Sequence, residues 1–219
     1  MIHVVAGAVI DAKGLVLIAQ RLPGKHLAGG WEFPGGKLEP GEQRTHGLAR
    51  ELREELGIEV RDPRPLLRLR HTYPYGEVLI DMWVVSRCDG AARGMEGQAL
   101  RWCTPEELAA AQLLPADQPI VRALRLPERL GESRTPFFEV YEGAVPSGSD
   151  DGRLHGVYTD TVAAGAAAAG AGADFIVLRP DLAGFEVAAL CNSVNVPVYV
   201  RGRSPEAAFR LGATGVHSL

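Results

Sequence analysis

The stretch Gly35–Ile58, GGKLEPGEQRTHGLARELREELGI, decides the fold of the first half of the chain. A Gly-Gly turn and a Pro-Gly loop precede a segment with helical spacing that ends at Leu56. Leu48, Leu52 and Leu56 recur every four residues, so they form one apolar stripe on a helix. The stretch therefore predicts an amphipathic helix over residues 43–56 that packs its leucines against a sheet.

Three carboxylates lie on this helix away from the leucine stripe. Glu51, Glu54 and Glu55 are close enough in helical spacing for their side chains to project to one side. Like charges packed this closely repel, and a hard divalent cation such as Mg²⁺ or Mn²⁺, which prefers oxygen ligands, would relieve the repulsion. The alternative is a solvated acidic helix face, on which Arg50 and Glu54 form an ordinary ion pair one turn apart.

The spacing of the whole stretch is more specific than a run of charges requires. From Gly36 the chain gives five residues, Glu42, seven residues, Arg50-Glu51-Leu52, one residue, Glu54-Glu55, one residue and Gly57-Ile58. This pattern resembles the signature of the Nudix hydrolases at every specified position. The resemblance implies a Nudix α/β/α sandwich with a mixed sheet over residues 1–129, and a hydrolase that cleaves a diphosphate linkage.

Within that superfamily the chain is similar to the MutT branch, which hydrolyses oxidised purine nucleoside triphosphates such as 8-oxo-dGTP. The segments that carry this closer likeness are Trp31–Glu39, Met95–Gln98 with Trp102, and Leu114–Pro119. The resemblance implies an 8-oxo-dGTP diphosphatase that releases pyrophosphate, clears the nucleotide pool of damaged precursors and so serves DNA repair. It also implies Mg²⁺ or Mn²⁺ as the cofactor.

The resemblance assigns the catalytic and metal-binding roles residue by residue. Glu54, Glu55 and the backbone carbonyl of Gly35 would bind the metal. Glu51 and Glu96 are each a candidate metal ligand and a candidate general base, and the sequence does not choose between them. The residues with a structural role in the motif would be Gly36, Glu42, Arg50 and Gly57, with Arg50 bracing Glu42.

The same likeness assigns the substrate contacts. Arg21 would bind the phosphates, with an exposed arginine beside a strand as the alternative. The nucleoside would be contacted by His26, Glu32, Phe33, Pro34 and Gly35. Asp117 stands where bacterial relatives carry a base-reading asparagine, and Gly76 stands where they carry an arginine. An ionised Asp only accepts hydrogen bonds, whereas burial would raise its pKa and restore a donor. The alternative role of Asp117 is to cap the helix that begins at Gln118.

Composition limits the other possibilities. The 219 residues carry a net charge of −4, which argues against a protein that binds nucleic acid or membrane surfaces stably. The three cysteines are far apart and lack the spacing of metal ligands, so they indicate thiols in a reducing compartment. No apolar run reaches the roughly 18 residues that span a bilayer, and no signal peptide precedes the first strand. We therefore expect a soluble cytoplasmic protein.

The order of elements differs between the two halves of the chain. Before residue 130 we expect hairpins over 2–20 and 66–86, a strand over 99–103 and a helix over 118–126. Residues 130–152, which include the turn-rich segment PSGSDDG, are predicted to be a linker. Strands then alternate with helices from 154 to 218, which is typical of parallel βα units.

Residues 153–219 resemble the C-terminal half of the thiamine-phosphate synthase/TenI family, which folds as a TIM barrel. The segments that carry this likeness are Gly172–Leu178, Val196–Gly202 and Leu211–Val216. Because a full barrel needs about 200 residues or more, we expect a partial, half-barrel domain. Its exposed edges would need a cover, such as an extra strand over 137–141 or a second subunit in a homodimer.

Three functions remain open at this point. The first is the MutT-type hydrolysis of a nucleoside triphosphate. The second is a Nudix pyrophosphohydrolase acting on CTP or on a diphosphate of the thiamine pathway. The third is a non-enzymatic Nudix-fold sensor, against which the intact set of Glu51, Glu54 and Glu55 argues.

Overall fold

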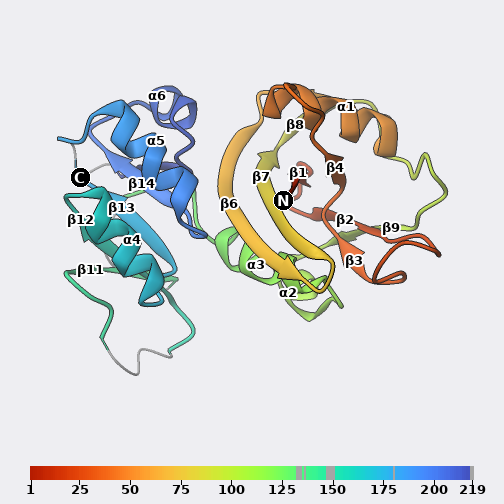
Figure 1. Cartoon of the computed structure of the whole chain (residues 1–219). Helices are drawn as coiled ribbons and strands as arrows, with labels where there is room; N and C mark the ends of the chain where they lie inside the picture. Colours follow the sequence, from red (N-terminus) through yellow and green to blue (C-terminus); the bar gives the residue numbers. More distant parts are fainter. Residues whose placement is uncertain (132–134, 136, 147–150, 180, 218–219) are drawn as a thin grey trace. The chain divides into compact units, whose positions relative to one another are not determined.

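The computed structural model of the chain describes residues 1–131, 135, 137–146, 151–179 and 181–217. Their contacts define two compact units, which are drawn in Figure 1. The first unit comprises Met1–Arg64 and Arg70–Val121, and the second comprises Pro65–Leu69 and Arg122–Leu219.

The first unit is built around a mixed four-stranded sheet in the order β4-β1-β7-β6. β1 runs parallel to β7, with Ile2 opposite Val78, and antiparallel to β4, with Ala6 opposite Gly35. Figure 1 shows β6 and β7 as two long neighbouring strands. The bounds are Gly35–Lys37 for β4, Ile2–Val9 for β1, Gly76–Val85 for β7 and Arg64–Tyr73 for β6.

Two smaller sheets complete the strands of this unit. One has the order β3-β2-β9, and the other pairs β5 with β8. The predicted hairpin over residues 2–20 is therefore wrong, because β1 and β2 lie in different sheets and meet at a bridge between Ile10 and Val16. The bounds are Trp31–Glu32 for β3, Val16–Gln20 for β2, Leu100–Cys103 for β9, Glu59–Arg61 for β5 and Arg87–Asp89 for β8.

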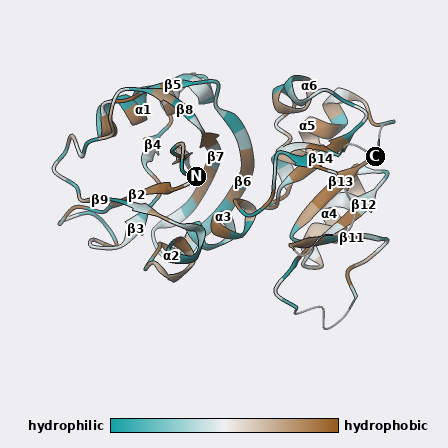
Figure 2. Cartoon of the chain, turned by 180° about the vertical axis from the view of Figure 1, so that it is seen from behind, coloured by the Kyte–Doolittle hydropathy of each residue, from teal (hydrophilic) through white to brown (hydrophobic). Residues whose placement is uncertain are grey.

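Helix α1 (Arg44–Leu56) confirms the predicted amphipathic helix. Leu48, Leu52 and Leu56 are fully buried and pack in one cluster with apolar residues of β1 and β7. Burying each leucine stabilises the fold by about 1.5–3 kcal/mol. Gly57 ends the helix in the left-handed conformation, with φ of 69°. In Figure 2 the helix carries both hydrophobic and hydrophilic segments, as the pattern predicts.

The remaining helices of this part of the chain are short. Helix α2 (Pro105–Ala110) begins with a capping box, since Thr104 and Glu107 each accept a hydrogen bond from the other's backbone N–H. A 3₁₀ turn, η1 (Pro115–Asp117), leads directly into α3 (Gln118–Ala123). The predicted helix over 118–126 therefore ends earlier than expected.

The second unit is a single parallel sheet in the order β10-β15-β14-β13-β12-β11. From β11 to β15 the spatial order follows the chain order, which is the arrangement of a barrel wall and not of a doubly wound sheet. The predicted half-barrel fold is therefore confirmed. The bounds are Arg129–Leu130 for β10, Phe138–Glu142 for β11, Leu154–Thr159 for β12, Phe175–Leu178 for β13, Val198–Arg201 for β14 and Gly215–His217 for β15.

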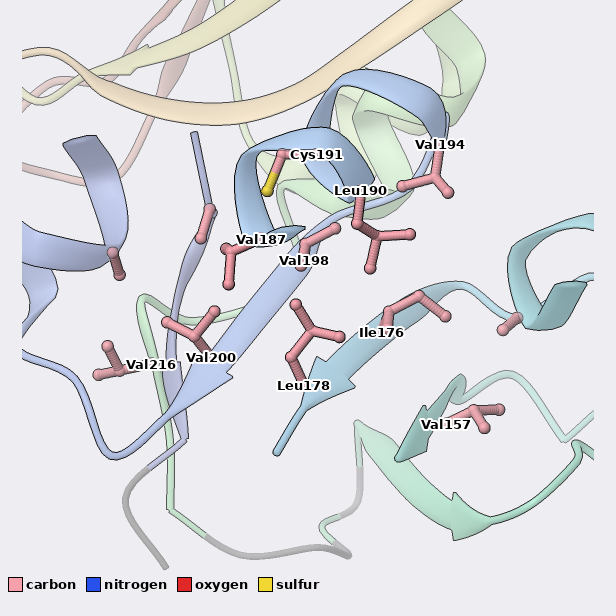
Figure 3. Close-up of a cluster of buried hydrophobic side chains, with 13 residues drawn as sticks. Val157, Ile176, Leu178, Val187, Leu190, Cys191, Val194, Val198, Val200 and Val216 are labelled. Carbon is pink, nitrogen blue, oxygen red and sulfur yellow. The ribbon is translucent and has the colours of Figure 1, made fainter. Parts of the chain in front are cut away.

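Three helices cover one face of this sheet, namely α4 (Val162–Gly170), α5 (Gly184–Ser193) and α6 (Pro205–Arg210). Figure 3 shows the core that they share with the strands: Val187, Leu190 and Cys191 of α5 lie against Val198 of β14 and Ile176 of β13. None of the helices that the structure describes is long and apolar enough to cross a membrane.

The range predicted as a linker, residues 130–152, carries the end of β10 and all of β11. β11 pairs in parallel with β12 over its full length, so this range contributes an edge strand to the half-barrel. Residues 147–150, within the turn-rich segment, lie outside the described residues. On the sheet face opposite the cluster in Figure 3, Phe138, Phe175 and Tyr199 form a second buried cluster.

Candidate active site

The acidic face of α1 lies against strand β4. The N–H of Gly35 donates a hydrogen bond of 3.0 Å to Oε2 of Glu55. A β-carbon on Gly35, whose φ is 152°, would lie 2.2 Å from the carbonyl oxygen of Val5. A β-carbon on Gly36 would lie 2.2 Å from Oε2 of Glu51. The absence of side chains on β4 therefore lets two carboxylates of α1 approach its backbone.

Arg50 binds three acids at once. It donates two hydrogen bonds to Glu42, at 3.0 and 2.9 Å, one to Glu51 at 2.8 Å and one to Glu54 at 3.4 Å. The hydrogen bonds from Arg50 lower the pKa of Glu42 to about 2. Arg50 also donates to the carbonyl of Lys37, so it ties α1 to the end of β4.

Glu55 is the carboxylate of this group that burial affects most. Burial raises the pKa of Glu55 to about 7, against the hydrogen bond from Gly35, and the nearby charges of Glu32 and Glu96 raise it further. A cation placed beside Glu55 would reverse this effect, because it would stabilise the ionised form.

The loop that carries Glu96 is fixed to the end of α1. The carbonyl of Glu55 accepts a hydrogen bond from Met95 N–H and another from the side-chain amide of Gln98, each at 3.0 Å. Gln98 also accepts from the N–H of Glu96 at 2.9 Å. Lys25 lies 3.3 Å from the carboxylate of Glu96. Glu96 is thus held near Glu55, although the two are distant in sequence.

The oxygen-rich donor set fits a hard divalent cation, but several of its carboxylates now bind basic side chains. In the residues that the structure describes, no three His, Cys, Asp or Glu side chains converge as they would around a metal ion. Glu51 and Glu54 turn toward Arg50, and Glu96 turns toward Lys25. Glu55, whose charged form burial disfavours, fits a cation best. Binding would require Glu51 and Glu54 to exchange Arg50 for the metal.

Arg21 lies at the centre of the predicted substrate contacts. Its guanidinium binds the carboxylate of Glu32 at 2.5 Å and the carbonyl of His26 at 2.7 Å. Backbone hydrogen bonds from Arg21 to Gly30 and from Gly29 back to Arg21 close the loop that contains His26. Burial raises the pKa of Glu32, while its ion pair with Arg21 opposes the shift.

Asp117 is a buried acid with one unsatisfied oxygen. Its side chain is 6% exposed, and it accepts a hydrogen bond from the N–H of Phe33. Among the residues described, its Oδ2 has no hydrogen-bond partner. Burial raises the pKa of Asp117 to about 8, and the charge of Glu32 adds to the rise. Asp117 ends the turn η1 and directly precedes α3.

These acids form a row across the unit. The charge of Glu32 perturbs the pKa of both Glu55 and Asp117. The residues that follow Glu32 bind these two acids, since Phe33 N–H donates to Asp117 and Gly35 N–H donates to Glu55. Arg21 is bound to Glu32 and also acts on the pKa of Asp117. The row thus comprises Glu55 on the acidic helix, Glu32 paired with Arg21, and the buried Asp117 beside Phe33.

Comparison with known proteins places this geometry in a family. The profile of the NUDIX domain matches residues 5–123, which is more than half of the chain. The chain belongs to the Nudix family. The match falls on the unit that carries the row of acids, and it supports the predicted Nudix pyrophosphohydrolase.

Curated relatives of this Nudix chain have two kinds of name. The CTP pyrophosphohydrolase of Escherichia coli (strain K12) is 42% identical over 123 residues, which are 56% of this chain and 90% of the relative. The 8-oxo-dGTP diphosphatase of Haemophilus influenzae is 34% identical over 124 residues, which are 57% of this chain and 91% of the relative.

Solved structures agree with the Nudix fold. The solution structure of the E. coli ORF135 protein is 41% identical, with a TM-score of 0.51, and the match covers 56% of this chain and 87% of that one. A MutT structure from a study of Aliivibrio salmonicida and Vibrio cholerae is 34% identical, with a TM-score of 0.50, and the match covers 56% of this chain and 95% of that one.

The structure also brings groups to the Nudix site that the sequence did not single out. Lys25 faces Glu96, and Gln98 ties the Glu96 loop to α1. Tyr73 lies close enough to Asp117 for the carboxylate to perturb its pKa. Gln98 lies in a segment that resembles MutT, whereas Lys25, in a loop, and Tyr73, at the end of β6, lie in sequence without any such signal.

Proposed function

We propose that the Nudix unit hydrolyses a nucleoside triphosphate, an oxidised purine such as 8-oxo-dGTP, to the nucleoside monophosphate and pyrophosphate. The enzyme would thereby clear the nucleotide pool and serve DNA repair. The observation that supports this most directly is that one short segment, residues 32–35, contacts all parts of the row: Glu32 binds Arg21, Phe33 N–H binds the buried Asp117, and Gly35 N–H binds Glu55 of the acidic helix. A nucleotide needs both kinds of group, acids that hold its metal-bound phosphates and a buried polar group that reads its base.

Each residue of the row then has a chemical task. Glu54, Glu55 and the carbonyl of Gly35 would hold Mg²⁺ or Mn²⁺, with Glu51 and Glu96 as further ligands. The bound cation would screen the departing pyrophosphate and make a water molecule more acidic. Glu51 or Glu96 would take the proton from that water. Arg21 would contact the phosphates, and Arg50 would keep the loop at Glu42 in place.

Asp117 is the proposed reader of the base, together with the backbone of Phe33, Pro34 and Gly35 and the side chain of His26. As an ionised acid it would accept from the ring N–H and the exocyclic amine of a guanine-type base. As a neutral acid it would donate to a ring nitrogen, which is what cytosine presents beside its amine.

CTP is therefore the second candidate substrate. The observation in its favour is the burial that raises the pKa of Asp117 to about 8, so that the neutral form prevails at pH 7 in the absence of substrate. The relative named CTP pyrophosphohydrolase, at 42% identity, is consistent with this candidate.

The test is a product assay on the full chain with Mg²⁺, using 8-oxo-dGTP, dGTP, CTP and thiamine diphosphate. We expect pyrophosphate release from a triphosphate, lost on chelation and lowered roughly 1000-fold in Glu54→Gln, because the metal supplies most of the catalysis. Glu54→Gln should also weaken Mg²⁺ binding in calorimetry. The matched control is Glu106→Gln, an exposed acid of α2, which should keep full activity.

Two further variants identify the base. Whichever of Glu51→Gln and Glu96→Gln removes the base should lower kcat by about 100-fold to 10,000-fold while Mg²⁺ still binds. Full activity of Glu54→Gln, or no turnover of any triphosphate by the unmodified chain, would refute the proposed function.

For the second unit we propose a relationship to the thiamine-phosphate synthase/TenI barrel, without catalysis of its own. Two features support it: strands in chain order along one parallel sheet, and helices between them. We also propose a cytoplasmic enzyme and a homodimer formed through the half-barrel. Light scattering of the full chain tests the dimer, and a monomer at all concentrations would contradict it.

A further inference from the structure

A cluster of four aromatic rings lies beside the row of acids, and His26 is the one member of the cluster that already has a role in the proposed function. Its members, here called the ring cluster, are His26, His71, Tyr73 and Tyr75. Tyr73 and Tyr75 are stacked, with centroids 5.1 Å apart and planes within 6°. His26 meets both tyrosines edge-on, at 6.0 and 4.8 Å, and His71 meets Tyr73 at 4.4 Å.

The cluster joins two separate segments of the Nudix unit. His71 and Tyr73 alternate at the end of β6, and Tyr75 follows in the turn before β7, so the three positions share one side of the strand. His26 comes from the loop that Arg21 closes. The next residue, Leu27, has φ of 58°, which is unusual for a leucine. The loop therefore holds a strained backbone while His26 contacts the tyrosines.

Tyr73 connects the cluster to Asp117. Its hydroxyl accepts a hydrogen bond from the backbone N–H of Ala116, the residue before Asp117. Burial raises the pKa of Tyr73, and the charge of Asp117 adds to the rise. The unsatisfied Oδ2 of Asp117 and the aromatic surface thus lie on neighbouring residues of one site. Tyr75, at the outer side of the stack, is 52% exposed.

We propose that the ring cluster, through Tyr75 above all, stacks on the base that Asp117 reads and makes the enzyme favour purine over pyrimidine nucleotides. This inference rests on the proposed function and names the substrate class of the same site. Stacking strength grows with the overlapping ring area, so a two-ring base gains more from a tyrosine face than a one-ring base does. Asp117 reads the edge of the base, whereas the ring cluster reads its size.

The experiment measures two things on the full chain with Mg²⁺: Kd for dGMP and dCMP by calorimetry, and kcat and KM for dGTP and dCTP. Tyr75→Ala should weaken dGMP binding and raise KM for dGTP by about ten-fold, within the range of base–aromatic stacking. The same variant should change Kd for dCMP and KM for dCTP by about two-fold or less, and kcat should change little for both substrates.

Two variants separate stacking from a merely structural role. Tyr75→Phe keeps the ring and should recover most of the purine affinity lost in Tyr75→Ala, whereas Tyr75→Leu keeps only the apolar surface and should not. Phe185 of α5 is 77% exposed, and Phe185→Ala removes its ring. This control should leave the Kd for dGMP and the Kd for dCMP unchanged.

Equal losses for dGMP and dCMP in Tyr75→Ala, or no loss for either, would overturn the inference. The binding assay also separates the two proposals. Selective loss of dGMP binding in a chain that hydrolyses no triphosphate would refute the proposed function and leave the ring cluster's role standing. Normal triphosphate hydrolysis with unchanged base selectivity in Tyr75→Ala would support the proposed function and refute the role of the ring cluster.

Discussion

The acids that burial affects most in the Nudix unit and the acids of the half-barrel respond to folding in opposite ways, whereas Glu42 and Glu59 of the Nudix unit have a pKa lowered by arginine. In the Nudix unit, burial raises the pKa of Glu32, of Glu55 to about 7 and of Asp117 to about 8. In the described part of the half-barrel, the carboxylic acids whose pKa is shifted have a pKa below the usual value. Arg153 lowers the pKa of Asp151 to about 2, and backbone and Ser204 hydrogen bonds lower that of Glu206. A carboxylic acid whose pKa is raised by folding lowers the stability of the fold at neutral pH, and one whose pKa is lowered by folding increases it.

The difference shows where function resides. A fold gains nothing by burying Asp117 without a full set of partners, so a ligand is the natural reason for keeping it there. The half-barrel instead places Leu190, Ile176 and Val198 in a dry apolar core. Its acids pair at the surface. Three predictions test this contrast between a unit organised for chemistry and one organised for packing.

The largest expected effect comes from Leu190→Ala in the half-barrel. Leu190 is fully buried, and its Cδ2 lies only 2.8 Å from where a β-carbon on Gly165 would be, so α4 and α5 pack closely around it. The change should lower the free energy of unfolding by about 3 kcal/mol, measured by urea denaturation.

At temperatures where Leu190→Ala stays folded, kcat of the Nudix unit should not change. Phe185→Ala, on the same helix but exposed, is the control and should change neither quantity by much. A fall in kcat that matches the loss of stability would show that the half-barrel takes part in catalysis, and the contrast between the units would fail.

Local spacing was enough to predict the parts of this molecule that depend on local geometry. The leucine stripe and the end of the helix at Leu56 both follow from residues a few positions apart. The hairpin over residues 2–20 failed because β1 gains more by pairing along its whole length with the distant β7. The pairing of β1 with β7 could not be predicted from the turn sequence between β1 and β2.

The site residues also differ in whether local spacing or tertiary contacts determine their arrangement. The carboxylates of α1 were predictable from the signature, and so was the bond between Arg50 and Glu42, which lie eight residues apart. The pairs of Arg50 with Glu51 and Glu54 are local to α1, and the sequence offered the Arg50–Glu54 pair as an alternative. The pairing of Lys25 with Glu96 and the ring cluster depend on tertiary contacts. Asp117 was a candidate from its sequence position, but only the fold shows how completely it is buried.

Gly36→Ala should affect activity strongly and stability little. The new β-carbon would lie 2.2 Å from Oε2 of Glu51, and the end of that flexible side chain would move to make room. A displacement of about 1 Å in a catalytic group can cost about 100-fold in rate, so we expect a loss of that order in kcat, measured in the pyrophosphate assay.

The melting temperature of Gly36→Ala should stay within a few degrees of the original. Gly170→Ala in α4 is the matched control, because a β-carbon there meets no atom within 4 Å. Full activity in Gly36→Ala would mean that Glu51 can leave its present position without harm, which would remove it from the list of ligands and bases.

Asp117→Asn tests the origin of the contrast. Because the folded pKa is about 8 and the usual value is 3.8, the folded state keeps a proton that the unfolded state has released between about pH 4 and pH 8. The stability that this proton provides is fully present below pH 4 and is lost as the pH rises to 8. The loss is at most about 1.4 kcal/mol per pH unit.

Asparagine cannot ionise, so the free energy of unfolding of Asp117→Asn should vary less with pH. The variant should become more stable relative to the original chain as the pH rises from 4 to 8. Glu55 titrates in both proteins and therefore cancels in the difference. Asp62→Asn, whose side chain is 76% exposed, should follow the original profile. Parallel profiles for Asp117→Asn and the original chain would show that Asp117 is ionised in the folded state. In that case a neutral Asp117 would no longer favour cytosine, and the guanine-type edge would be the better match.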